Sequence, residues 1–142
     1  QGWLSKEVIE KVAETLSMSF IRVMEVATFY SLFNLQPIGK NLIQICRTTP
    51  CWLRGSDKLL EIAKKFTGCE IGETSKNNQF TLVEVECLGA CCNAPMVQIN
   101  DEYYEDLDEN NFKEILNKLK NNLNINRGSQ IGRRSSEPTR EN

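Results

Sequence analysis

The sequence 42-LIQICRTTPC-51 decides how this chain folds, because it joins a buried strand to a pair of cysteines. Its first four residues form a short, mostly apolar run of the kind that is found in buried strands. Cys46 closes that strand, and Cys51 lies in the following loop after four intervening residues. We therefore expect a strand whose carboxyl end presents two thiols within one short loop.

A second stretch, 80-FTLVEVECLGAC-91, repeats this arrangement. Its first seven residues are rich in Val and Phe and alternate roughly, so they predict another strand. Cys87 closes that strand, and Cys91 follows after three intervening residues. Gly89 lies between the two cysteines and has no side chain to keep the backbone away from a ligand. Both pairs thus lie at strand exits, which is where sites are built in α/β folds.

The remaining sequence of residues 39–123 completes an α/β pattern. Apolar residues at helical spacing predict one helix after Cys51 and another after Asp108, which is a suitable N-cap. Residues 96–99 and the tyrosines at 103–104 predict two further strands joined by a turn. The order β-α-β-β-α matches the core of a thioredoxin-like fold. We therefore predict one thioredoxin-like α/β (α+β) domain over this region.

The two flanks of this domain differ from it and from each other. Ser5 and Ser19 each precede apolar residues at helical spacing, so residues 1–38 predict a small helical domain. Residues 124–142 hold few apolar side chains and four arginines, so we expect an extended tail that binds a partner or is disordered. Because Gln1 rather than Met stands first, we expect the chain to be part of a longer protein.

Composition excludes several classes of function. The chain has 142 residues, of which 40% are hydrophobic, and its net charge is −2. This balance gives no basic surface for nucleic acid, and no apolar run approaches the roughly 20 residues of a membrane helix. No secretory signal is visible, so the six cysteines are expected to be reduced. The lack of histidine excludes His-ligated zinc, haem and Rieske clusters, and catalysis by a histidine base.

Four thiolates suit more than one kind of site. A [2Fe–2S] cluster takes two thiolates per iron, and two separated pairs fit this directly. A zinc-stabilised interaction module also takes four cysteines, although its pairs more often form a tight knuckle. A thiol–disulfide enzyme is less favoured because no Cys-x-x-Cys pair is present. Cys92 has nearly the same separation from Cys87 as Cys91 has, whereas Cys69 stands alone near the end of a helix.

Six segments carry a family resemblance, namely 46-CRTTPCWLRGS-56, 84-EVECLGAC-91, 93-NAPM-96, 26-VATFY-30, 72-GET-74 and 136-SEP-138. They resemble the E subunits of NADH:quinone oxidoreductases, the enzymes of respiratory complex I. The resemblance implies a thioredoxin-like ferredoxin domain with one [2Fe–2S] cluster. It implies four ligands, namely Cys46, Cys51, Cys87 and Cys91, and leaves Cys92 as a spare thiol. No catalytic residue is predicted, so the oxidoreductase activity belongs to the complex as a whole.

The same resemblance implies partners and a location. It places the chain beside the flavin- and NADH-binding subunit and other subunits of a peripheral arm, where the cluster exchanges single electrons near the flavin. That arm lies on the cytoplasmic side of the bacterial inner membrane, or on the matrix side in mitochondria. Family members carry more helix before Gly2, so an N-terminal segment is expected to be missing here. NAD-linked hydrogenases and formate dehydrogenases contain an equivalent subunit and are the alternative.

Overall fold

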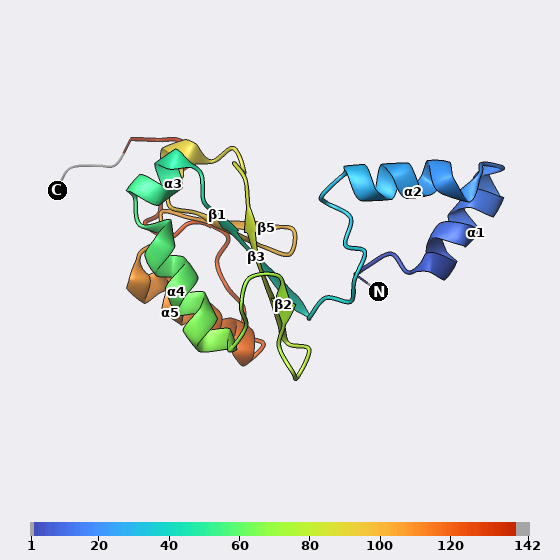
Figure 1. The fold of residues 1–142 in the computed structure, drawn as a ribbon. Coiled ribbons are helices and arrows are strands. Elements are labelled where there is room, and N and C mark those ends of the chain that lie inside the picture. Colours follow the sequence, from blue (N-terminus) through green and yellow to red (C-terminus); the bar gives the residue numbers. More distant parts are fainter. Residues whose placement is uncertain (1, 139–142) are drawn as a thin grey trace. The chain divides into compact units, whose positions relative to one another are not determined.

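The computed structural model describes residues 2–138 of the chain. By its internal contacts, the chain divides into two compact units, Gln1–Ile38 and Gly39–Asn142. Figure 1 shows a helical first unit and a second unit built on a sheet. The thiols all belong to the second unit, so the fold of that unit decides where they meet.

The first unit contains two helices, α1 (Lys6–Leu16) and α2 (Phe20–Phe29), as the sequence predicts. Ser5 caps α1, because its Oγ accepts a hydrogen bond from the Val8 N–H at 3.4 Å. Ser19 stands at the N-cap of α2 without a side-chain hydrogen bond. The buried side chains of this helical pair are Ile9, Ala13 and Ala27. A pair of short helices with so few buried side chains keeps most of its apolar surface exposed.

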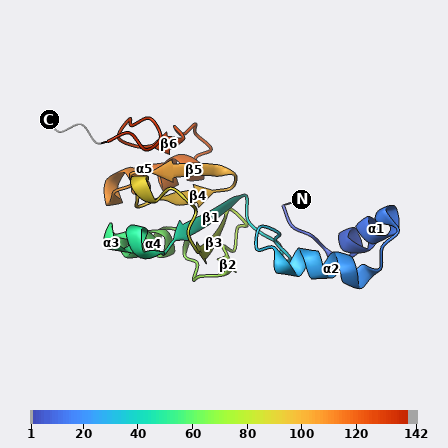
Figure 2. The same ribbon diagram turned by 90° about the horizontal axis from the view of Figure 1, so that it is seen from above.

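The second unit is built on a six-stranded sheet in the order β2-β3-β1-β4-β5-β6, which can be followed in Figure 2. The strands are β1 (Asn41–Cys46), β2 (Glu73–Thr74), β3 (Phe80–Val85), β4 (Val97–Ile99), β5 (Glu102–Glu105) and β6 (Gly128–Ser129). β1 runs parallel to β3 and antiparallel to β4. β4 and β5 form a hairpin whose turn places Asn100 at φ +55°, a conformation that Asn tolerates. The Ala94–Pro95 peptide bond ahead of β4 is cis.

Helices cover one face of this sheet and enclose the main core. These helices are α4 (Ser56–Thr67) and α5 (Glu109–Lys120), whereas α3 (Thr49–Leu53) contacts a short 3₁₀ turn, η1 (Cys91–Asn93), and contributes Cys51 to a separate cluster. Figure 1 shows α4 and α5 side by side. Alternate residues of β1, Ile43 and Ile45, pack in one cluster with Leu82 of β3 and Phe112 of α5. Successive side chains of a strand point to opposite faces, so Ile43 and Ile45 share one face, while Leu42 and Cys46 on the other face are buried as well.

The predicted fold class is confirmed, with additions at the edges of the sheet. β2 and β6 are two residues long each, which is too short for an alternation pattern to predict them. Residues 124–138 run beside the domain, where β6 pairs in parallel with β5 and Arg127 pairs with Glu102 at 2.9 Å. Binding of a partner by this tail stays a prediction, and residues 139–142 lie outside the described part of the chain.

Candidate metal centre

The two cysteine loops meet because β1 and β3 are parallel neighbours. Cys46, the last residue of β1, is in register with Val85, the last residue of β3. The Arg47 N–H donates to the Val85 carbonyl at 3.2 Å, so the ladder continues into the loops. Because the carboxyl ends of parallel strands lie at the same edge of a sheet, the loops after β1 and β3 begin at the same place. Cys87, two residues beyond β3, therefore emerges beside the loop that follows Cys46.

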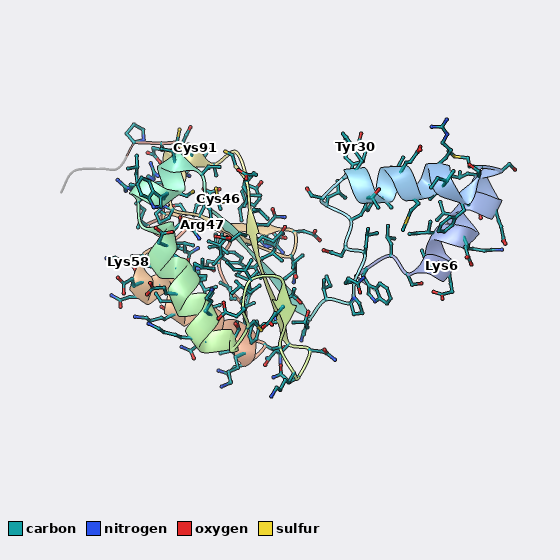
Figure 3. The ribbon with its side chains drawn as sticks, viewed as in Figure 1. Lys6, Tyr30, Cys46, Arg47, Lys58 and Cys91 are labelled. Atoms are coloured by element: carbon teal, nitrogen blue, oxygen red, sulfur yellow. The ribbon has the colours of Figure 1, made fainter. Side chains whose placement is uncertain are left out.

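The four predicted thiols form one pair from each loop. The Sγ atoms of Cys87 and Cys91 lie 3.3 Å apart, and both side chains are exposed. Cys46 and Cys51 are buried, with 1% exposure each, in a small cluster with Ala94 and Met96. Figure 3 shows the labelled Cys46 and Cys91 at the end of the domain where α3 lies. The site thus has a buried half and an exposed half.

The two thiol pairs lie close to each other, and each influences the pKa values of the other. Burial raises the pKa of Cys51 to about 12, and the thiols of Cys46 and Cys91 act in the same direction. Burial also opposes ionisation of Cys46, but hydrogen bonds with Thr48, Leu88 and Cys51 together outweigh it and lower the pKa of that thiol. The Gly89 N–H lowers the pKa of Cys87, whereas the contact with Cys87 raises the pKa of Cys91.

Each loop therefore supplies one thiol whose pKa is lowered and one whose pKa is raised. Thiols bind metal as thiolates, so metal binding releases protons from these thiols. A [2Fe–2S] cluster takes two thiolates per iron, and the two thiol pairs, one from each loop, supply that set of soft ligands. The residues present thus fit a [2Fe–2S] cluster.

Two polar side chains that sequence reasoning missed support these loops. The Thr48 Oγ1 lies 3.4 Å from the Cys46 Sγ, and the Thr48 side chain also helps to lower the pKa of the Cys87 thiol. The Tyr103 hydroxyl donates to the Leu88 carbonyl at 2.7 Å, which ties the second loop to β5. Thr48 stands two residues after a cysteine, and this proximity was the only signal available. Tyr103 gave none, because it is distant in sequence from the loop that it holds.

The other two cysteines and Arg47 take no part in the thiol pairs. Cys69 is buried in the main core, and Cys92 is exposed. Arg47 directly follows Cys46, but its guanidinium is paired with Asp57 at 2.6 Å and with Glu84. Its positive charge is therefore balanced by two carboxylates instead of being left free beside the thiols.

Gly89 is required for its backbone conformation. The sequence predicts a close approach of the backbone to a ligand, and the Gly89 N–H does donate to the Cys87 Sγ at 3.4 Å. A Cβ at this position would meet nothing within 4 Å among the protein atoms, but its φ is +84°. An L-residue with a side chain is strained at such a φ, by about 1–2 kcal/mol. The left-handed turn thus aims the N–H at the sulfur.

We expect Gly89→Ala to lower the free energy of unfolding by about 1 kcal/mol because of this strain. Gly89→Asn should cost less, since Asn visits left-handed conformations more readily than Ala. Guanidinium unfolding curves of the three chains, recorded by circular dichroism under reducing conditions, measure the difference. If Gly89→Ala and the unmodified chain had the same unfolding midpoint, a side chain at residue 89 would not strain the turn.

A thioredoxin-like sheet with four clustered thiols at the exits of two parallel strands defines a small iron–sulfur protein. A family model supports this classification over most of the chain. The chain belongs to the family of thioredoxin-like [2Fe–2S] ferredoxins, whose model matches residues 1–120. Membership confirms the predicted fold and the predicted cofactor, one [2Fe–2S] cluster. The assignment of its four ligands stays a prediction that the geometry supports.

Relatives of known name agree with the resemblance. The chain is 55% identical over 120 residues to the E subunit of the NADH-quinone oxidoreductase of Rickettsia bellii, and the match covers 84% of this chain and 72% of that protein. The same protein of Rickettsia conorii is 56% identical over the same shares. The mitochondrial NADH dehydrogenase [ubiquinone] flavoprotein 2 of Dictyostelium discoideum is 46% identical over 96% of this chain and 55% of that protein. The predicted resemblance to E subunits is confirmed.

Solved structures share the fold at low sequence identity. An NAD⁺-reducing [NiFe]-hydrogenase matches with a TM-score of 0.76 and 16% identity, over 83% of this chain and 21% of that chain. A thioredoxin-like [2Fe–2S] ferredoxin from Aquifex aeolicus matches with a TM-score of 0.50 and 18% identity, over 67% of this chain and 98% of that chain. These likenesses show the fold alone.

Proposed function

We propose that this chain is the electron-transfer E subunit of an NADH-quinone oxidoreductase, with Cys46, Cys51, Cys87 and Cys91 as ligands of its cluster. The observation that carries the proposal is the meeting of two thiol pairs at the exits of β1 and β3, in a chain 55% identical to a protein of that name. A bound [2Fe–2S] cluster supplies one-electron chemistry. The oxidoreductase activity belongs to the whole complex, to which this chain contributes.

The protein's own role is to hold and shield such a centre. Cys46 and Cys51 are buried with Ala94 and Met96, so water is kept from one half of the site. Hydrogen bonds to the sulfurs, such as that from Gly89, are among the means by which a protein sets a reduction potential. The exposed thiols, Cys87 and Cys91, mark the side from which a redox partner approaches.

The partner in this proposal is the flavin- and NADH-binding subunit, together with other subunits of the peripheral arm. No Gly-rich dinucleotide loop follows a strand in this sequence, so electrons from NADH must arrive through another chain. The helical unit supports contact with such subunits, because Phe29 is 79% and Leu32 71% exposed. These two side chains lie three residues apart in the sequence, and contiguous exposed apolar surface is typical of interaction sites.

The location in this proposal is the cytoplasmic side of a bacterial inner membrane, and the alternative is the matrix side in mitochondria. No helix in residues 2–138 is both long and apolar enough to span a bilayer. The equivalent subunit of an NAD-linked hydrogenase is the alternative function. It is less favoured because the hydrogenase match is 16% identical, whereas the E subunits are at least 53% identical in the five Rickettsia relatives.

Metal analysis tests the cluster. Anaerobically prepared protein should contain about two iron atoms and two acid-labile sulfides per chain. Electron paramagnetic resonance should detect an unpaired electron after chemical reduction. A colourless preparation with one zinc per chain and no sulfide would instead support the interaction module without a redox role.

Reduction by NADH tests the partner. We expect NADH alone to leave the visible spectrum of the loaded chain unchanged, because the chain has no dinucleotide site. NADH together with catalytic amounts of the flavin- and NADH-binding subunit should decrease the visible absorbance of the loaded chain. Loaded chain in which Phe29 has been replaced by Ala is the matched variant for the apolar surface. Reduction of the cluster by NADH without the partner subunit would contradict the proposal that NADH is bound by the partner and that this chain only receives electrons.

A further inference from the structure

We propose that Arg133, from the C-terminal tail, is a positioning residue for the turn that carries Cys91. The inference deepens the proposed function and depends on it, because Cys91 is one of the four proposed ligands. Cys91 is the first residue of the short turn η1, which continues through Cys92 and Asn93. Arg133 lies about forty residues further along the chain, yet it contacts this turn directly.

The guanidinium of Arg133 binds both the turn and the end of β5. Its Nη2 donates to the Cys92 carbonyl at 3.0 Å and to the Asn93 Oδ1 at 3.0 Å. Its Nε donates to the Asp106 Oδ2 at 3.1 Å, and Nη2 also contacts the second oxygen of that carboxylate. The side chains of Arg133 and Asp106 are only 12% and 5% exposed. A bidentate pair held in this way fixes the guanidinium plane, and with it the direction of the donors that reach the turn.

Asn93 completes the contact in the opposite direction. It is 4% exposed, and its Nδ2 donates to the Ser135 carbonyl at 2.6 Å and to the Glu105 Oε2 at 2.5 Å. The Asp106 N–H in turn donates to the Asn93 carbonyl at 2.8 Å. The turn is thus bound by the tail and by the residues at the end of β5. Removing Arg133 would leave the Asp106 carboxylate buried without its cation, which is costly.

The orientation of this turn decides which thiol faces Cys87. A 3₁₀ turn has three residues per revolution, so adjacent side chains diverge by about 120°. Only one of Cys91 and Cys92 can therefore point at Cys87, and the Sγ of Cys91 does so at 3.3 Å. Arg133 holds the carbonyl of the competing Cys92, so it fixes the rotation of the turn that favours Cys91.

The turn needs such support because it lies in an exposed loop. Cys87, Cys91 and Cys92 are all exposed, and Gly89 adds backbone freedom between the first two. Residues that orient metal ligands from outside typically change metal affinity 10–100-fold when they are lost. We therefore expect Arg133 to affect how long the cluster is retained, without touching a ligand sulfur.

The test compares two arginines of the same tail in the full chain, purified anaerobically with its cluster. Arg133→Ala removes the contact with the turn. Arg127→Ala is the matched control, because Arg127 is 72% exposed and pairs only with Glu102 among the interactions described for it. Loss of visible absorbance in excess chelator should be at least about tenfold faster in Arg133→Ala and close to unchanged in Arg127→Ala. Equal rates in the two variants would overturn the inference.

Further readouts separate positioning from general stability. The resonance spectrum of the reduced cluster should change in Arg133→Ala and not in Arg127→Ala, because the geometry at Cys91 changes only in the first. Arg133→Lys should restore the rate of loss only in part, since an ammonium cannot donate to the turn and to both carboxylate oxygens in one plane. If Arg133→Lys restored the rate of cluster loss completely and the spectra of all variants were unchanged, the positioning role would be contradicted. Only the positive charge at residue 133 would then matter.

Two controls keep the outcome interpretable. If Arg133→Ala does not fold, Arg133→Gln, which keeps amide donors and loses the charge, replaces it under the same criterion. If the unmodified chain itself binds no iron and sulfide, the proposed function fails. If it holds a full cluster and Arg133→Ala behaves like Arg127→Ala, only the present inference fails.

Discussion

Cys91→Ala should abolish cluster binding, whereas Cys92→Ala, one residue further along, should retain it. The reason is geometric, because the Sγ of Cys91 lies 3.3 Å from that of Cys87, and no comparable contact with another thiol is described for Cys92. Each iron of a [2Fe–2S] cluster takes two thiolates, so the loss of one leaves an open coordination position. The iron and sulfide content should fall from about two atoms of each per chain to near zero in Cys91→Ala.

Cys87→Ala should behave like Cys91→Ala, and these two variants are the cleanest tests because both side chains are exposed. Replacing Cys46 or Cys51 also removes a buried side chain, so a lost cluster there combines two effects. Cys69→Ala is the buried control, since Cys69 lies in the main core with 2% exposure and should affect stability alone. A cluster that survives Cys91→Ala but not Cys92→Ala would move the ligand assignment by one residue.

The fold was predictable where a local pattern carried the information. Alternation in 80–85 and helical spacing in 109–120 each depend on neighbours in the sequence, and both elements are present. Asp108 caps the last helix as predicted, because its carboxylate accepts from the N–H groups of Asn110 and Asn111. β2 and β6 are held by pairing with distant strands instead, so no pattern within two residues reveals them.

The site was predictable to the level of its two cysteine pairs, and the structure explains why the rest was not. Spacing and strand exits place each pair, and parallel neighbours bring the pairs together. Thr48, Tyr103 and Arg133 act through contacts that depend on the folded arrangement. The Arg133 contact with Asn93 spans a sequence separation of 40 residues, where neither periodicity nor spacing gives information. The composition of the tail instead predicted an extended segment that binds a partner or is disordered.

The largest effect on stability should come from Leu116→Ala in α5. Leu116 is fully buried, in one cluster with Phe112, Ile43 and Leu82. Truncating a buried Leu removes apolar contacts and leaves a cavity that the packed sheet and helices fill only in part. We expect the free energy of unfolding to fall by about 3 kcal/mol.

Leu123→Ala is the matched control, because the same chemical change is made just beyond the end of α5 at a side chain that is 59% exposed. Leu123→Ala should change the free energy of unfolding by no more than about 0.5 kcal/mol. Guanidinium unfolding midpoints, recorded by circular dichroism under reducing conditions, measure both variants. Because Leu116 packs in the main core and the thiols Cys46 and Cys51 belong to a separate cluster, the resonance spectrum of folded, loaded Leu116→Ala should match that of the unmodified chain. Similar midpoints for the two Leu variants would contradict the core as described, and an altered spectrum would show that the core and the thiol site are coupled.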